Sequence, residues 1–166
     1  MGIRHEAREW ALQFLFQSEF NREDTVEEGF RLFWQHQDEE NSSPAPVISS
    51  EERSRKKARL FAEELAKGVI EHHRDIDARI IHHAENWDIG RMGTVERNAM
   101  RLAVFEMLHR HDIPPVVSIN EAVELAKAYS STESAKFVNG ILDRIRKEID
   151  RPARDPSPAP PHAESK

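Results

Sequence analysis

The amino-acid sequence predicts an all-α domain of six to seven helices. Apolar residues recur at the i, i+3, i+4, i+7 spacing of an amphipathic helix along most of the chain. Three capping boxes, in which a Ser or Thr is followed three residues later by Glu, mark helix starts at Thr25, Ser49 and Ser118. With 166 residues and 38% hydrophobic content, the chain is long enough to bury a core without disulfides or a structural metal.

The first half of the chain predicts an amphipathic helix over residues 5–20 and a second from Thr25 to about His36. Residues 38–50 are rich in charge, Ser and Pro, which is typical of a solvated loop. A long helix follows from the capping box at Ser49, with a break expected near residues 72–75. Its first turns hold a basic run, which we interpret mainly as a solvated face.

The second half predicts a central buried helix. Gly90 and Gly93 mark a turn, and Thr94 is expected to cap the helix that follows. Residues 95–108 are apolar nearly all round, as expected of a helix surrounded by others. Pro114 and Pro115 then prevent its continuation.

Residues 118–149 predict two helices separated by a short break, the first capped by Ser118 and the second by Thr132. The expected buried stripes are Ile119, Ala122, Val123, Ala126 and Tyr129 in the first helix, and Ala135, Val138, Leu142, Ile145 and Ile149 in the second. Phe137 lies about 100° from Val138 and therefore off the core stripe. Gly140 costs about 1 kcal/mol relative to alanine in a helix, and we attribute it to close helix packing.

Domain organisation follows from composition. We expect one helical domain over residues 1–150 and a disordered tail over residues 151–166, which contain five of the nine prolines and lack apolar periodicity. The absence of cysteine excludes disulfides and thiolate metal sites and favours a cytoplasmic protein. No apolar run is long enough to cross a membrane, and the first residues do not resemble a secretory signal.

The motif content argues against an enzyme. Neither a phosphate-binding glycine loop nor a GxSxG elbow is present, and the acidic residues are too dispersed to nominate a catalytic pair. None of the nine histidines has another four residues away, so we predict surface histidines and no metal site. We therefore expect no catalytic residues and no cofactor.

RNA binding is the function for which the residues offer ingredients. Single-stranded RNA is held by Lys or Arg side chains on phosphates and by aromatic or guanidinium planes on bases. Arg4, His5 and Arg8, together with Lys136 and Phe137, supply these groups. The formal net charge of −6 means that any such binding requires a local patch.

The segments HEAREWALQFLFQ, NWDIGRMGTVERNAMRLAVFEML and INEAVELAKAYSSTESAKFVNGILDRI resemble, in this order, the NusB family of transcription antitermination factors. The resemblance extends from Arg4 to Ile149 and implies two three-helix halves and no enzymatic activity. It further implies pairing with the ribosomal protein NusE, binding of single-stranded boxA RNA, and action on the transcribing RNA polymerase complex. It allows a homodimer as well as a monomer.

The resemblance also assigns roles to individual residues. Glu96 is the candidate for binding the protein partner. Residues 53–59 are expected to supplement an N-terminal arginine cluster that is smaller than is common in the family. The candidate RNA-binding residues are Arg4, His5, Arg8, Phe16, Glu133, Lys136 and Phe137.

Two other functions remain open at this point. One is an RNA-binding module without antitermination activity, similar to the module found in ribosomal RNA methyltransferases. The other is a helical scaffold that binds only protein. Salt dependence distinguishes the scaffold, because RNA binding weakens steeply as salt rises whereas an apolar protein interface does not.

Overall fold

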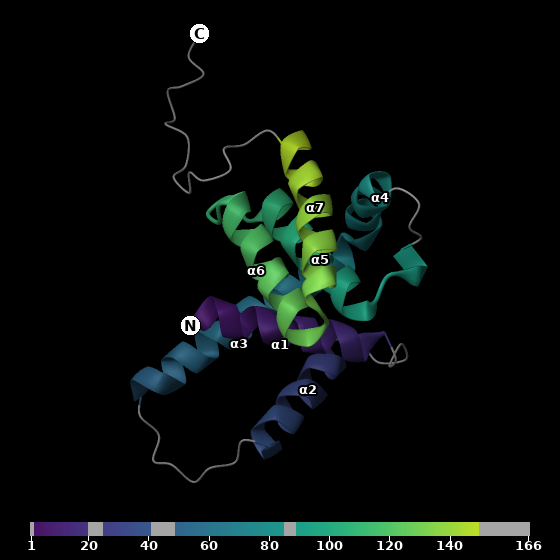
Figure 1. Ribbon diagram of the computed structural model, residues 1–166. Coiled ribbons are helices and arrows are strands. Elements are labelled where there is room, and N and C mark those ends of the chain that lie inside the picture. Colours follow the sequence, from purple (N-terminus) through teal and green to yellow (C-terminus); the bar gives the residue numbers. More distant parts are fainter. Residues whose placement is uncertain (1, 20–24, 41–48, 85–88, 150–166) are drawn as a thin grey trace. The chain divides into compact units, whose positions relative to one another are not determined.

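The computed structural model describes residues 2–19, 25–40, 49–84 and 89–149, and these residues form helices without any strand (Figure 1). The predicted all-α fold is confirmed. The chain divides into two compact units, Met1–His73 and Arg74–Lys166. The α-helices are α1 (Ile3–Ser18), α2 (Val26–Glu40), α3 (Ser49–Glu71), α4 (His73–His83), α5 (Thr94–His109), α6 (Pro115–Tyr129) and α7 (Thr132–Glu148), with a short 3-10 turn, η1 (Ile89–Arg91), before α5.

The first unit contains α1, α2 and α3, with α1 packed along α3. Phe14 of α1 stacks on Phe30 of α2 at a centroid distance of 4.1 Å and meets Phe33 edge-on at 5.8 Å. These three rings are almost fully buried, so aromatic packing supplies much of the apolar contact between α1 and α2.

Helix starts in this unit agree with the sequence only in part. Thr25 caps α2, because its Oγ1 accepts a hydrogen bond from the Glu28 amide at 3.2 Å. The second half of the predicted box is missing, since the Glu28 carboxylate accepts from the Arg31 guanidinium instead. The expected break in the long helix is confirmed at His72, between the end of α3 and the start of α4.

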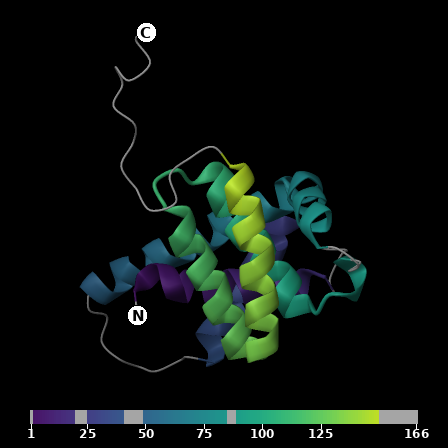
Figure 2. The same ribbon diagram turned by 45° about the horizontal axis from the view of Figure 1, so that its top comes forward.

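The second unit contains α4 to α7, and α5, α6 and α7 pack against one another (Figures 1 and 2). Most of the α5 side chains are buried, as expected of a central helix. The other helices contribute buried stripes to the same core, with Ile76 and Ile80 from α4 and Val138 and Leu142 from α7 fully enclosed. This core fixes which face of α7 remains outside.

Three predicted caps are wrong. α6 begins at Pro115, whose missing N–H and fixed φ suit the first helical position. Ser118 therefore lies inside α6, almost fully buried, and donates to the Glu106 carboxylate at 2.8 Å. Ser131 rather than Thr132 caps α7, and Gly93 rather than Thr94 holds the N-cap position of α5.

Two packing expectations also fail. Tyr129 is 42% exposed, because the inner face of α6 continues through Leu125 instead. A Cβ built on Gly140 would meet nothing within 4 Å, so this glycine does not serve close helix packing. Gly140 instead leaves an open notch on α7.

Two expectations lie outside the described residues, namely the middle of the loop over residues 38–50 and the tail over residues 151–166. None of the described helices is long and apolar enough to cross a lipid bilayer.

Candidate nucleic-acid interface

The start of α1 holds two of the predicted RNA-binding cations against one aromatic ring. The guanidinium carbons of Arg4 and Arg8 lie 5.2 and 5.5 Å from the centroid of the Phe61 ring on α3, within cation–π distance. Arg4 is exposed, whereas Arg8 is only 3% exposed. The structure therefore leaves Arg4 at the surface and places Arg8 in the packing between α1 and α3.

The other two candidates on α1 are separated from this pair. The His5 ring is half-buried, and its Nε2 lies 3.5 Å from the Glu9 carboxylate. Phe16 is 44% exposed, but it follows Arg8 by eight residues, or about 12 Å along the helix axis. The four candidates of this unit thus do not form one compact site.

The basic run at the start of α3 is mostly solvent-facing, as predicted. Arg53, Arg55, Lys56 and Lys57 are exposed. Arg59 differs, because its guanidinium lies 4.8 Å from the Trp34 ring and pairs with the Asp38 carboxylate. Four cations of this run are therefore exposed to solvent, and Arg59 serves the packing of α3 on α2.

The second unit brings the remaining candidates onto one face of α7. Glu133, Lys136, Phe137 and Gly140 follow the i, i+3, i+4, i+7 spacing and together form what we name the outer stripe of α7. Glu133 and Lys136 are exposed, and Phe137 is half-buried. Phe137 is only partly buried whereas the neighbouring Val138 is fully buried, so Phe137 lies beside the core stripe of α7 and not within it.

The start of this stripe is anchored by Glu96, the predicted partner-binding residue. Glu96 is 8% exposed, and its carboxylate accepts a hydrogen bond from the hydroxyl of Ser130, which links α6 to α7. Burial alone would raise the pKa of Glu96, but hydrogen bonds from Ser130 and Ser134 and from its own amide lower the pKa overall. Glu96 is thus an ionised acid that holds the α6–α7 junction.

Sequence reasoning missed the role of Ser130 and attributed Gly140 to helix packing. Ser130 was grouped with its neighbours as a helix break, because nothing in the local sequence shows that a residue 34 positions away accepts its hydrogen bond. Gly140 had a usable signal, since it stands four residues after Lys136 and hence on the same helix face. The described residues also bring together His82, His83 and Glu148, whose wide spacing in the sequence concealed them.

The NusB family model matches residues 5–147, which is most of the chain and both structural units. This chain belongs to the NusB family. The family resemblance read from the three sequence segments is confirmed.

Curated relatives in the family match over nearly their full length. The transcription antitermination protein NusB of Thermodesulfovibrio yellowstonii is 42% identical, with 87% of this chain and 92% of that protein aligned. The protein of the same description from Myxococcus xanthus is 40% identical, with 92% of this chain and 100% of that protein aligned. Both relatives are described as transcription antitermination proteins, which agrees with the expectation that the chain is not an enzyme.

Solved NusB structures share the fold. T. maritima NusB superposes with a TM-score of 0.69 at 36% identity, covering 89% of this chain and 93% of that one. A second match, with a TM-score of 0.68 at 29% identity, covers 88% of this chain and 97% of a chain from a crystal structure of antitermination factors NusB and NusE in complex with dsRNA. Family membership thus extends to the arrangement of the helices.

Proposed function

We propose that this chain is a transcription antitermination factor that binds RNA together with NusE. The observation that supports this most directly is the end-to-end match to curated antitermination proteins, with all of the Myxococcus xanthus protein covered. A NusB solved with NusE and RNA supports the same pair of ligands for this chain. The coverage also favours this function over a module of a ribosomal RNA methyltransferase.

The outer stripe of α7 is the part of the proposed RNA surface with the clearest chemistry. The Lys136 ammonium provides a mobile charge for a phosphate, and the half-buried Phe137 ring provides its exposed edge to one base. Glu133 provides only acceptor oxygens, which suit the amino groups of bases. Gly140 leaves the helix backbone open to close approach by the ligand.

The α1 candidates take different parts in this proposal. Arg4, His5 and Phe16 lie at the surface or partly so, and we assign them to RNA contact. The buried Arg8 is assigned a positioning role through Phe61, the ring that it shares with Arg4. Glu96 supports the partner site by fixing Ser130 and the start of α7.

The proposal is tested by fluorescence titration of a labelled single-stranded boxA RNA, with and without NusE. We expect tighter binding of boxA RNA than of a scrambled RNA of the same length, and a further gain when NusE is present. A duplex of the same sequence distinguishes single-stranded from double-stranded recognition. Equal affinity for boxA and scrambled RNA, in the presence of NusE, would contradict sequence-selective binding.

Salt dependence tests the contribution of Lys136. The logarithm of the binding constant falls with the logarithm of salt concentration in proportion to the number of phosphates neutralised. Lys136→Gln should reduce this slope by roughly 0.7 on single-stranded RNA, whereas Lys136→Arg should preserve it. An unchanged slope in Lys136→Gln would place the phosphate contact elsewhere.

Action on the transcribing RNA polymerase complex, in the cytoplasm, completes the proposal. In vitro transcription through a terminator downstream of boxA should show more readthrough when this chain and NusE are both added. RNA binding without added readthrough would favour the alternative function, an RNA-binding module without antitermination activity. Light scattering of the free protein distinguishes a monomer from a homodimer.

A further inference from the structure

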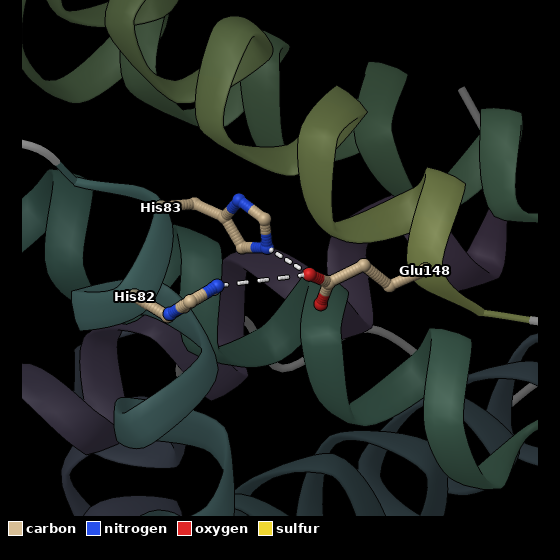
Figure 3. A group of neighbouring side chains, drawn as sticks. All are labelled: His82, His83 and Glu148. Carbon is tan, nitrogen blue, oxygen red and sulfur yellow. Dashed lines mark ion pairs between the residues drawn. The ribbon is translucent and has the colours of Figure 1, made fainter.

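Two histidines and a carboxylate from different helices converge within the second unit. His82 and His83 are the last residues of α4, and Glu148 is the last residue of α7 (Figure 3). The Nε2 atoms of His82 and His83 lie 3.9 and 2.9 Å from the same Glu148 Oε1. All three ligand atoms lie within 4.8 Å of one another.

From this geometry we propose that His82, His83 and Glu148 form a binding site for a divalent transition metal ion, with Zn²⁺ as the expected occupant. Zinc binds imidazole nitrogen at about 2.0 to 2.1 Å and carboxylate oxygen at about 2.0 to 2.2 Å. Tetrahedral coordination at these lengths separates the ligand atoms by about 3.3 Å. The separations of 2.9 and 3.9 Å from the Glu148 oxygen bracket this value, but the three ligand atoms span up to 4.8 Å, so the exposed His82 side chain has to rotate toward the other two to complete the site.

The two rings are already oriented toward a shared point. They meet edge to face, with centroids 4.8 Å apart, and both Nε2 atoms face the Glu148 carboxylate (Figure 3). The His83 side chain is 14% exposed, whereas that of His82 is 74% exposed. His83 thus provides the more fixed ligand, whereas the exposed His82 and Glu148 can adapt and leave a coordination position open to water.

The backbone around the site also favours a cation. Two helices end here, α4 at His83 and α7 at Glu148, and each helix C-terminus has a partial negative charge. Arg144 of α7 donates from Nη1 to the His83 carbonyl oxygen at 2.8 Å, which fixes the end of α4 against α7. A bound ion would therefore add a second connection between the ends of α4 and α7, which this hydrogen bond already joins.

The ligand set and its neighbours predict metal selectivity. Two imidazoles with one carboxylate suit zinc, copper and nickel, whereas calcium and magnesium prefer oxygen ligands. Arg79 acts electrostatically on Glu148 and Arg144 bonds the His83 carbonyl oxygen, so both guanidinium groups are near the site and repel any dication. Only a metal that gains strongly from imidazole ligation offsets this repulsion, so Ca²⁺ and Mg²⁺ should not compete.

Proton competition predicts the pH dependence. Metal binding needs neutral imidazoles and an ionised carboxylate, so protons compete with the metal for the same ligand atoms. Affinity should therefore fall as the pH is lowered. The charged and titratable groups at the site are the three ligands, Arg79 near Glu148, and Arg144 at the His83 carbonyl.

Isothermal titration of Zn²⁺ into the metal-stripped, tag-free full chain tests the proposal. We expect one saturable site and a rise in melting temperature on zinc addition. His83→Gln and Glu148→Gln should each lower zinc affinity by at least about tenfold, as expected for loss of a ligand. The Co²⁺ form should show visible d–d absorption that is lost in the same variants.

Matched controls use histidines elsewhere in the chain. His72→Gln and His111→Gln change exposed histidines and should leave zinc affinity unchanged. His82→Gln, at an exposed position, tests the site even if His83→Gln disturbs folding. Zinc affinity that is equal in wild type, His82→Gln and Glu148→Gln, or equal binding of Ca²⁺, would overturn the proposal.

Discussion

The start of α1 and the start of α7 both hold a cation and an aromatic ring, yet the cation is buried in one region and exposed in the other. On α1, Arg8 is buried and its guanidinium lies over Phe61. On α7, Lys136 is exposed and Phe137 is half-buried on the outer stripe. The comparison shows that the same basic and aromatic pattern can lie in the packing between two helices or on the outer face of one helix, depending on where the core of the unit lies.

The largest expected effect is on stability, at the buried member of the α1 pair. Arg8→Ala removes a desolvated cation–π contact and the buried stem of the side chain, and should lower the free energy of unfolding by about 2 to 3 kcal/mol. Arg4→Ala is the matched control at the same ring and should cost about 0.5 to 1 kcal/mol, because Arg4 is exposed. Urea unfolding measures both.

For RNA affinity we expect the opposite order, with a larger loss in Arg4→Ala than in Arg8→Ala. Arg4→Ala removes an exposed charge and should weaken binding and its salt dependence. The folded fraction of Arg8→Ala should bind RNA almost as well as wild type if Arg8 acts only by positioning. A loss of affinity in Arg8→Ala larger than that in Arg4→Ala would make Arg8 a direct RNA contact.

The next largest effect is expected on α7. Phe137→Ala should weaken RNA binding by about 1 to 3 kcal/mol, the usual value of one stacked base, and should change the melting temperature little. Val138→Ala, at the fully buried neighbour, should do the opposite and mainly destabilise the fold. Fluorescence titration and thermal melting separate the two outcomes. A large loss of stability in Phe137→Ala would show that this ring belongs to the core.

Phe16 on α1 can be compared with Phe137 on α7, because both are phenylalanines proposed to contact RNA. It is 44% exposed on α1, away from the Arg4 and Arg8 pair. If RNA follows both regions, Phe16→Ala should also weaken binding in the same titration. If only α7 provides a stacking surface, Phe16→Ala should leave affinity unchanged.

A smaller effect is expected at the anchor of the α7 stripe. Ser130→Ala removes a hydrogen bond to the buried Glu96 carboxylate and should cost about 1 kcal/mol of stability at neutral pH. The pKa of Glu96 is lowered in the folded state, so this stabilisation is present above the pKa of the unfolded chain and is lost as the pH falls through the folded pKa.

Urea unfolding across pH 3 to 7 measures this contribution. The difference between wild type and Ser130→Ala should shrink in the acidic range as Glu96 becomes protonated. Thr132→Ala, at the exposed first position of α7, should show no such pH dependence. A difference that is constant with pH would mean that the Glu96 charge does not contribute.

The contrast between α1 and α7 also explains which features could be predicted from sequence. Helical periodicity located the helices and the exposed side of Phe137, because these depend on residues a turn or two apart. It could not reveal that Arg8 packs on Phe61 or that Ser118 donates to Glu106, because both partners come from other helices. The capping box at Ser118 predicted the wrong helix start, because Pro115 is itself suited to the first position of a helix.

The smallest expected change is a gain in stability, and it tests whether Gly140 on the outer stripe of α7 serves a ligand. Gly140 is helical and an added Cβ meets no neighbour, so Gly140→Ala should stabilise the fold by about 0.5 to 1 kcal/mol through helix propensity. Asn139→Ala, at another exposed position of α7, is the control for a propensity gain alone. If RNA or NusE approaches the backbone at this notch, Gly140→Ala should weaken complex formation while raising the melting temperature. An increase in stability with unchanged binding would restrict the ligand surface to Glu133, Lys136 and Phe137.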